Sequence, residues 1–512
     1  MSSPNIVILF TDQQQAATIH PESQCRTPTL DELGTSGTRF DRCYSPNPIC
    51  SPSRASFMTG VLPHVHGMIN VTHGVEPYGA RFRPELETWS ERLSDAGYTN
   101  GYFGKWHVER TGDLTEFGFD DYSVLRSDEF RSAFRDHRAS LGLTREPDRS
   151  ASGVRDPITV EDEGYEDFLL SGQIDEPVEG MADHFVYSQG LEFIREAAES
   201  DGPWSTVIST YAPHDPYLSP TEFRELYDVD DIELPQSFDD TLADRPTLYR
   251  RQRDIWADLS RTECAEAITA YYAYCTFVDR QVERVVETLR ETGQLEDTII
   301  IYTSDHGDYA GTHGLFLKGA PAFEEAYRVP CLVRTPDRYP DGVVRDDIVQ
   351  LQDLAPTIVD LATGEDFPPT SRLSPENPHA RGGENVAKLE GDPSFTATSL
   401  VPFLRDETPT DHTNEGFAEF HGQDFPWTQR VYWNDDTKYV FNTFDDDELY
   451  DLAADPHEQS NVAQDDEYEE VTKILAERMW QIARETGDYQ ISELHYGMHR
   501  FAPVGPNGRN RT

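Results

Sequence analysis

Lysine is nearly absent from this sequence of 512 residues. The chain holds five lysines, and they are Lys105, Lys318, Lys388, Lys438 and Lys473. Ninety-four aspartate and glutamate residues against 43 lysine and arginine residues give a formal net charge of −51 at pH 7. Such a surface repels nucleic acid and anionic membranes, so we expect neither as a partner. Because salt screens repulsion between like charges, the composition predicts a protein from a salt-adapted organism.

Cysteine and long apolar runs are also scarce. The six cysteines show neither the spacing of zinc ligands nor that of a disulfide framework, which suits a reducing compartment. No apolar run is long enough to span a bilayer, and no basic and apolar segment typical of a secretion signal opens the sequence. We therefore expect a cytoplasmic protein. The 24 tyrosines and 26 phenylalanines are too many for a disordered chain, so the acidity belongs to a folded surface.

Compact apolar runs alternate with helical patterns along the first 300 residues. Buried strands are predicted at 5–11, 206–211 and 298–304. Apolar residues with helical spacing predict helices at 27–36, 88–96, 181–199 and 263–291. Strands that alternate with helices favour an α/β fold, in which a large and mainly parallel sheet is covered by helices on both faces.

The length favours more than one domain, and the pattern of the chain suggests where to divide it. Residues 1–410 form the predicted α/β domain, with an acidic insertion at about 126–179. We interpret this insertion, which shows little periodicity, as a long loop that could cover a pocket. A second stretch at 366–396 is similarly loop-like. Short alternating strands begin near residue 411, so 411–512 is predicted to be a smaller C-terminal α+β subdomain.

The motif Cys-Ser-Pro-Ser-Arg at residues 50–54 places a cysteine at the start of a predicted helix. Ser51 suits the N-cap, and Pro52 suits the first helical turn, where its missing N–H costs nothing. Cys50 would then precede free backbone N–H groups and the positive end of the helix dipole. Arg54 adds a positive charge one turn into the helix. A reactive residue beside an anion site indicates chemistry on an anionic ester.

Polar residues follow two of the predicted strands directly. Asp12 and Gln13 come after the first strand, and Asp305 and His306 come after the strand at 298–304. Ligands gather at the carboxyl ends of strands in open α/β sheets, so these side chains are expected to converge. A site of mixed oxygen and nitrogen ligands fits one divalent cation. Calcium suits the oxygens, and the histidine nitrogen keeps manganese as the alternative.

A lysine and a histidine, Lys105 and His107, follow a segment that looks extended, at 98–104. Residues two apart on an extended backbone point to the same side, so both side chains are expected to face one place. Because the chain holds five lysines in 512 residues, we interpret a lysine and a histidine that face one place as functional residues.

Together these motifs resemble those of the type I sulfatases, the formylglycine-dependent branch of the alkaline phosphatase superfamily. The resemblance rests on the segment from Cys50 to the Thr-Gly at 59–60, on Gly-Lys-x-His at 104–107, on Pro-His-x-Pro-Tyr at 213–217 and on the block after Asp305. It implies an alkaline-phosphatase-like fold. It also implies that a formylglycine-generating enzyme oxidises Cys50 to formylglycine.

The same resemblance assigns roles to single residues. It implies that Asp12, Gln13, Cys50, Asp305 and His306 hold the metal. Lys105 and Lys318 would bind the sulfate, and Arg54 would stabilise charge on the sulfuryl oxygens. His107 would act as a base toward the formylglycine hydroxyl, and His214 would protonate the departing alcohol. The implied reaction is hydrolysis of a sulfate monoester, and the implied substrate is a sulfated sugar, an aryl sulfate or a choline-sulfate-like molecule.

Two alternatives remain open from the residues. Many sulfatases carry Asp-Asp and Asp-Asn at the two strand ends, whereas Gln13 and His306 resemble choline sulfatases and phosphonate monoester hydrolases. A phosphonate monoester or phosphodiester hydrolase is therefore one alternative. The pair of Lys105 and His107 favours sulfate, since phosphonate hydrolases generally lack it. The other alternative is a binding protein in which Cys50 is never modified.

Overall fold

The computed structural model describes residues 3–72, 82–83, 86–143, 150–161, 167–336, 339–367, 397–423 and 425–492. Its centre is an eight-stranded sheet. From edge to edge the strands are β12 (Val343–Arg345), β2 (Thr38–Phe40), β11 (Cys331–Arg334), β10 (Thr298–Ser304), β1 (Asn5–Asp12), β8 (Trp204–Pro213), β4 (Thr99–Gly104) and β5 (Asp121–Val124). The strand β1 pairs in parallel with β10 and β8, and β11 alone runs antiparallel to its two neighbours. The predicted, mainly parallel α/β sheet is confirmed.

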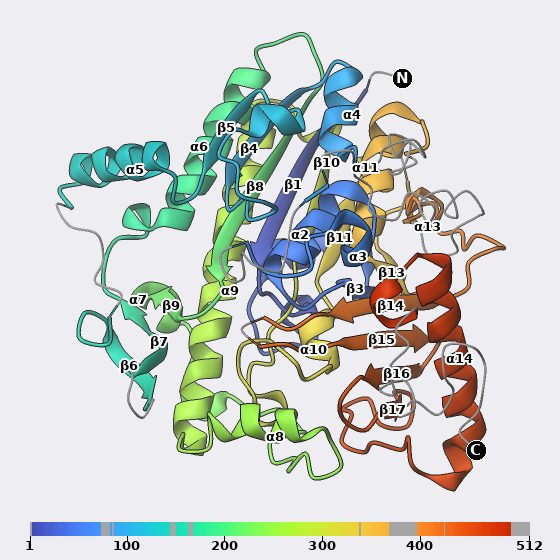
Figure 1. The fold of residues 1–512 in the computed structure, drawn as a ribbon. Helices are drawn as coiled ribbons and strands as arrows, with labels where there is room; N and C mark the ends of the chain where they lie inside the picture. The colour runs from blue at the N-terminus through green and yellow to red at the C-terminus, as the bar shows by residue number, and fades with distance from the viewer. Residues whose placement is uncertain are drawn as a thin grey trace.

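Helices cover both faces of this sheet, as the ribbon in Figure 1 shows. Alternate residues of β1 point to opposite faces, so Ile8 joins one apolar cluster and Val7 joins another. The cluster around Ile8 includes residues of α2 (Cys50–Thr59), α4 (Trp89–Asp95) and α11 (Leu354–Thr363). The cluster around Val7 includes residues of α1 (Pro28–Thr35), α6 (Ala182–Ala197) and α9 (Arg261–Glu291). Burial on both faces explains why the strands are apolar throughout.

The C-terminal part of the chain forms a separate antiparallel sheet beside the main one (Figure 1). Its strands are β14 (Glu415–Phe420), β15 (Gln429–Asn434), β16 (Thr437–Asn442) and β17 (Glu448–Asp451). The helix α14 (Glu469–Glu485) covers it, with Met479 and Trp480 buried against Phe441. This arrangement is the α+β organisation expected after residue 411. Val61 and Leu62 of the larger part belong to the same apolar cluster, so the two parts share a core.

The interpretation of residues 126–179 as a long loop is wrong. The segment contains α5 (Asp128–Ser140), β6 (Arg155–Val160) and β7 (Phe168–Ile174), and β7 pairs with β9 (Tyr217–Pro220). Phe130 and Phe134 lie one turn apart on α5 and pack into the main core, but acidic and basic neighbours hide this short apolar stripe in the sequence. Of the second loop-like stretch, residues 368–396 lie outside the described part of the chain.

Shorter elements connect these parts. They are β3 (Cys43–Tyr44), α3 (Pro63–His66), α7 (Thr221–Arg224), α8 (Thr247–Asp254), α10 (Glu324–Tyr327), β13 (Val349–Gln350), α13 (Val401–Leu404) and α15 (Tyr489–Ser492). In the described ranges, no helix combines the length and the apolar character that crossing a membrane requires.

Candidate active site

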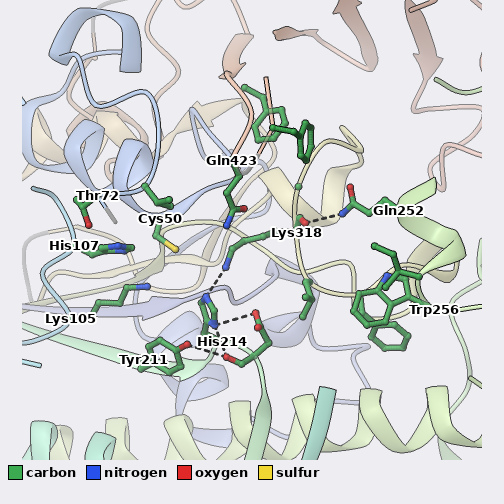
Figure 2. Close-up of a pocket in the computed structure, with 18 of the residues that line it drawn as sticks. Cys50, Thr72, Lys105, His107, Tyr211, His214, Gln252, Trp256, Lys318 and Gln423 are labelled. Carbon is green, nitrogen blue, oxygen red and sulfur yellow. Dashed lines mark hydrogen bonds and ion pairs between the residues drawn. The ribbon is translucent and has the colours of Figure 1, made fainter. Parts of the chain in front are cut away.

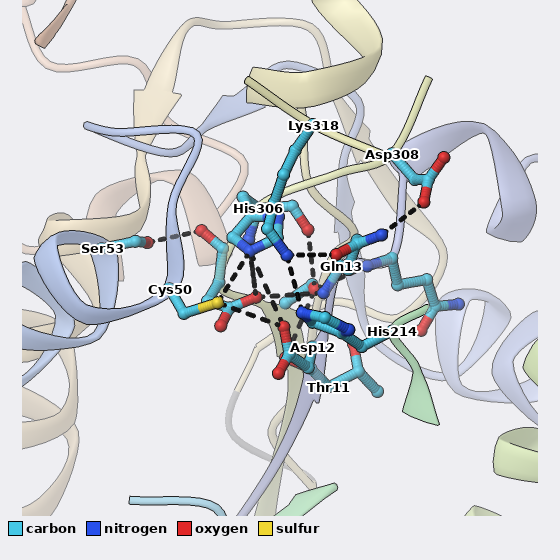
Figure 3. Close-up of polar contacts among 12 residues, drawn as sticks. Thr11, Asp12, Gln13, Cys50, Ser53, His214, His306, Asp308 and Lys318 are labelled. Carbon is cyan, nitrogen blue, oxygen red and sulfur yellow. Dashed lines mark hydrogen bonds and ion pairs between the residues drawn. The ribbon is translucent and has the colours of Figure 1, made fainter. Parts of the chain in front are cut away.

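Two strand ends and one helix start meet at a single point. Asp12 is the last residue of β1, and Asp305 follows β10, which runs parallel to β1 with Ser304 opposite Thr11. Cys50 is the first residue of α2. Within the described residues, one ligand atom from each of Asp12, Cys50, Asp305 and His306 lies within 4.8 Å of the others, and all four residues are buried. Figure 3 shows this cluster with Gln13, Lys318 and His214 around it.

The prediction that Ser51 caps the helix is wrong. The helix α2 begins one residue earlier, at Cys50, and Ile49 is its N-cap because its carbonyl accepts from the Ser53 N–H at 3.2 Å. The Ser51 hydroxyl instead accepts from the backbone N–H of Thr72 at 3.2 Å. Cys50 nevertheless stands at the positive end of the helix dipole, as expected.

The environment of Cys50 favours its ionised form. Its sulfur lies 3.3 Å from Nε2 of His306 and 3.7 Å from a carboxylate oxygen of Asp12. Burial alone would raise the pKa of the thiol, but Lys105, Lys318 and His306 outweigh it and lower the pKa well below its usual value. An anionic group at position 50 is therefore stabilised by the surrounding positive charge.

Arg54 lies beneath the pocket and does not line it. Its Nε donates to Oδ2 of Asp305 at 2.7 Å, and its Nη1 donates to the Lys105 carbonyl and to the Ser209 hydroxyl, both at 2.8 Å. With a side chain 1% exposed, Arg54 fixes the orientation of Asp305 instead of facing a ligand. The predicted role of Arg54 in stabilising charge on the sulfuryl oxygens stays a prediction.

The residues present fit a divalent cation. Two carboxylates, an imidazole nitrogen and residue 50 surround one point, and such a set of ligands suits calcium or manganese. Burial raises the pKa of Asp12, but Lys105, His214 and Arg54 bring it down to about 2, so its carboxylate is ionised. Gln13 lies beside the cluster. Its amide oxygen accepts from Lys318, and its amide nitrogen donates to Asp308 at 2.6 Å.

Lys105 and His107 both line the pocket, although not for the predicted reason. The extended strand β4 ends at Gly104, and His107 has a φ of 53°, so the backbone turns between them. Gly104 is required at this turn, because a Cβ there would lie 1.9 Å from the Ser209 carbonyl oxygen. Burial and the charge of Lys105 lower the pKa of His107, which leaves its imidazole neutral and able to accept a proton.

His214 and Lys318 form a pair on the other side of Cys50 (Figure 2). Nδ1 of His214 lies 2.7 Å from the Asp215 carbonyl oxygen, which only accepts, so Nδ1 carries the ring proton. Nε2 is then the acceptor, and it lies 2.7 Å from Nζ of Lys318. Burial would lower the pKa of Lys318, but Cys50, Asp215 and Asp12 raise it, so the lysine holds the shared proton.

A pocket of about 760 Å³ opens above the cluster. Of the residues predicted from the sequence, those that line it are Cys50, Lys105, His107, His214 and Lys318. The other predicted residues, Asp12, Gln13, Arg54, Asp305 and His306, are buried beneath it. The rest of the lining, including Arg126, Tyr211 and the residues of α8, was not predicted from the sequence. Helical spacing of apolar residues at 248–255 marks a helix face, but nothing local indicates which part of the protein that face meets.

The chain is similar in sequence and in fold to known proteins. A sequence model of the family described as Sulfatase matches residues 4–364. The chain is 29% identical over 487 residues to the uncharacterized sulfatase YidJ of Escherichia coli, covering 92% of this chain and 85% of that protein. It is 28% identical over 478 residues to the choline-sulfatase of Rhizobium meliloti, covering 90% and 82%. A solved phosphonate monoester hydrolase from Silicibacter pomeroyi has the same fold, with a TM-score of 0.76, 22% identity and coverage of 96% and 97%.

Proposed function

The chain belongs to the sulfatase family and is an enzyme that hydrolyses sulfuric esters, and from this premise we propose which residues carry the reaction. Residue 50 is the nucleophile. One divalent metal is held by Asp12, residue 50, Asp305 and His306. We propose calcium as this metal, with manganese as the alternative. The observation that carries the proposal is the meeting of these four ligand atoms within 4.8 Å, below a pocket flanked by two lysines.

The nucleophile we propose is Cys50 after oxidation to formylglycine by a formylglycine-generating enzyme. As its hydrate, formylglycine supplies two hydroxyl groups on one carbon, one to attack sulfur and one whose deprotonation expels sulfate. The metal, when bound, supplies positive charge that favours an ionised hydroxyl and polarises the sulfuryl oxygens. The low pKa of the Cys50 thiol supports this choice of site, because the same surroundings stabilise an oxyanion at position 50.

Lys105 and Lys318 bind the negative oxygens of the sulfate in this proposal. Both line the pocket, and both carry positive charge close enough to lower the pKa of Cys50. Arg54 acts as a positioning residue through its bond to Asp305. A misplaced carboxylate would shift the ligand set, so this buried contact supports the geometry of the whole site.

The two histidines of the pocket move protons. His214 and Lys318 share one proton and deliver it to the departing alcohol, and the raised pKa of Lys318 favours Nζ as its place before the reaction. His107 is hydrogen-bonded to Cys50 and has a lowered pKa, so it is neutral and takes the proton of the second hydroxyl. Acid and base are thereby separated into two groups with different surroundings.

A phosphonate monoester hydrolase remains the second candidate. It is favoured by the strand-end residues Gln13 and His306. The pair of Lys105 and His107 favours sulfate. Turnover of a sulfate ester compared with turnover of a phosphonate monoester and a phosphodiester, each measured on the same preparation, separates the candidates.

The proposal extends to the organisation and location of the protein. We assign residues 1–410 to the catalytic α/β domain and residues 411–512 to the C-terminal subdomain. We also assign the protein to the cytoplasm. All six cysteines are free and buried, which suits a reducing compartment.

Peptide mass spectrometry over residue 50 tests the proposal most directly. Protein produced with a formylglycine-generating enzyme should carry formylglycine at this position and hydrolyse a sulfate ester. The Cys50→Ala variant should fold and be inactive, whereas Cys275→Ala, a change at a buried cysteine of α9, should be active. Sulfatase activity from protein in which every Cys50 is an unmodified thiol would contradict the proposal, as would a fully converted residue 50 without activity on any sulfate ester.

A further inference from the structure

The part of the pocket beyond Lys318 has an apolar wall. Its side chains come from α8 and the two residues after it, from the segment before Lys318 and from the segment after β14, and they are Leu248, Ile255, Trp256, Phe316, Leu317 and Phe425. Figure 2 shows Trp256 on the opposite side of Lys318 from Cys50. Ile255 is 52% exposed and Phe425 is 38% exposed, and most large apolar residues of the described chain are far more buried. A ligand that covers such a surface gains binding energy from the area it removes from water.

One face of α8 builds much of this wall. Leu248, Arg251, Gln252 and Ile255 lie three or four residues apart, so they share one side of the helix, and all four line the pocket. On another side the buried Tyr249 fixes the helix, because its hydroxyl donates to Glu448 at 2.8 Å. The wall is therefore held in place before a ligand arrives, which lowers the entropy cost of binding.

Carboxylates, which would accept hydrogen bonds from the hydroxyl groups of a sugar, are scarce in the pocket. Among the described residues that line the pocket, Asp215 is the only carboxylate, and its Oδ1 already accepts from Gln13 at 3.1 Å. The amide nitrogen of Gln252 donates to the Lys318 carbonyl at 2.9 Å. A buried sugar leaves several hydroxyl groups in need of partners, and each hydroxyl without one costs free energy. An apolar ring has no such requirement.

The charge of the pocket also bears on which alcohol part of a sulfate ester the pocket accepts. Arg126 and Arg251 line it, and neither forms an ion pair with a carboxylate of the described residues. The guanidinium of Arg126 lies 4.8 Å from the centre of the Tyr211 ring. In a protein of net charge −51, two arginines without acidic partners make a local positive field. Such a field repels a quaternary ammonium group and attracts a second negative group.

We propose that this enzyme acts on sulfate monoesters of apolar ring alcohols, aryl or alicyclic, that are neutral or carry a second negative charge, in preference to sulfated sugars and choline sulfate. The inference rests on the proposed function, because it places the sulfate at Cys50 and the alcohol against the wall of α8. It follows from the exposed apolar side chains, the scarcity of carboxylates and the positive field, which are three separate properties of the pocket.

Two pairs of esters of primary alcohols, similar in shape within each pair, test the preference. Cyclohexylmethyl sulfate and glucose 6-sulfate are both sulfates of a primary alcohol on a six-membered ring, and only the second ring carries hydroxyls. The first should have a kcat/KM at least about tenfold higher. 3,3-Dimethylbutyl sulfate has the shape of choline sulfate without its charge, and it should also be the better substrate. A higher kcat/KM for glucose 6-sulfate or for choline sulfate would overturn the inference.

Variants of the wall give a second readout. Ile255→Asn should raise KM for cyclohexylmethyl sulfate about tenfold and leave inhibition by inorganic sulfate unchanged, because sulfate does not reach the wall. Ile474→Asn is the matched control, since Ile474 is 62% exposed on α14 and lies outside the pocket. Arg251→Gln should reduce the difference in kcat/KM between 3,3-dimethylbutyl sulfate and choline sulfate. Equal effects of the two asparagine variants would contradict the inference.

Failure of the proposed function has a different signature. Protein that carries formylglycine and hydrolyses a phosphonate monoester but none of the four sulfates would contradict the sulfatase assignment, and this inference would fall with it. Hydrolysis of all four sulfates with the sugar preferred would leave the sulfatase assignment standing and overturn the inference alone.

Discussion

Nζ of Lys318 lies 2.7 Å from Nε2 of His214, whose other ring nitrogen donates to the Asp215 carbonyl. The imidazole therefore accepts from the lysine through Nε2. In the proposed mechanism the two side chains act together as one acid, with the proton on the lysine and the histidine hydrogen-bonded to it. Removing either member should cost nearly as much as removing both, because each needs the other to place the proton.

The acid pair predicts a dependence on the leaving group. His214→Ala should reduce kcat/KM about 100-fold or more for an alkyl sulfate, whose alkoxide needs a proton, and far less for an activated aryl sulfate. The measurement is a series of sulfate esters that differ in the acidity of the alcohol. His20→Ala serves as the control, because His20 is exposed and does not line the pocket. An equal loss across the whole series would show that His214 is not part of the acid.

A burst experiment separates His107 from His214. If His107 acts only when sulfate is expelled, His107→Ala should release about one alcohol per site from an activated aryl sulfate and then stop. His214→Ala should turn over slowly without such a stall. Rapid mixing with detection of the phenol measures both. Equal losses without a burst in either variant would mean that the two histidines do not divide the proton transfers in this way.

Much of the site could be predicted because it lies at the ends of strands. The apolar runs of β1 and β10 mark the strands, and a parallel sheet brings the residues that follow them, Asp12 and Asp305, to one edge. Arg54 shows where this reasoning ends. Its contact with Asp305 joins residues 251 positions apart, and it depends on how α2 lies across the sheet. No local pattern distinguishes an arginine that faces a substrate from one that holds a carboxylate.

The fold was predictable to a similar extent. Long elements with uninterrupted periodicity, such as α9, were expected within a few residues of their observed ends. The helix and strands of the insertion at 126–179 were not expected, because α5 carries only two buried phenylalanines, Phe130 and Phe134, among charged residues. The strands β6 and β7 of the same segment are stabilised by pairing with each other and with β9, which no short stretch of sequence reveals. The boundary near residue 411 stays a prediction.

Metal binding should depend on Asp305 and not on its neighbour Asp308. Asp305→Ala should lose both the bound divalent metal and the activity, since it removes a ligand from the four-residue cluster. Asp308→Asn should retain the metal. Burial raises the pKa of Asp308 to about 6, and its carboxylate is occupied by Gln13 and Tyr217. Elemental analysis after gel filtration measures the metal content, and the far-UV circular dichroism of both variants reports the fold. Activity that survives complete chelation would contradict a metal-dependent mechanism.

His66 should make the protein less stable at mildly acidic pH. Nδ1 of His66 accepts from the Met68 N–H at 3.1 Å, so its Nε2 donates to Ser56, 2.9 Å away, and the ring is neutral. Burial lowers its pKa from 6.5 to about 3. At a pH between these two pKa values, His66 binds a proton in the unfolded chain and does not bind one in the folded chain. The contribution of His66 to the free energy of unfolding is therefore complete above pH 6.5. It falls as the pH decreases toward 3, by up to about 1.4 kcal/mol per pH unit.

Urea unfolding at pH 7 and at pH 5 measures this effect. The free energy of unfolding of the wild type should fall more between the two values than that of His66→Asn, which has no ring to charge. The difference between the two proteins isolates His66 from the other groups that titrate in this range. His64 is a useful contrast, because Glu419 raises its pKa against the effect of burial. Its stabilising charge is present below its unfolded pKa and is lost as the pH rises. An identical pH dependence for wild type and His66→Asn would contradict the prediction.

The net charge of −51 predicts that the folded state needs salt. Repulsion among surface carboxylates reaches about 30 Å at 0.01 M salt and about 3 Å at 1 M, so a compact acidic protein is destabilised as salt is removed. The melting temperature should fall steadily as sodium chloride is lowered from molar to millimolar concentration. Sucrose at matched osmolality should not replace the salt, because it stabilises proteins by exclusion and screens no charge. A melting temperature that is unchanged at millimolar salt would show that the acidity of this chain is not an adaptation to a screening medium.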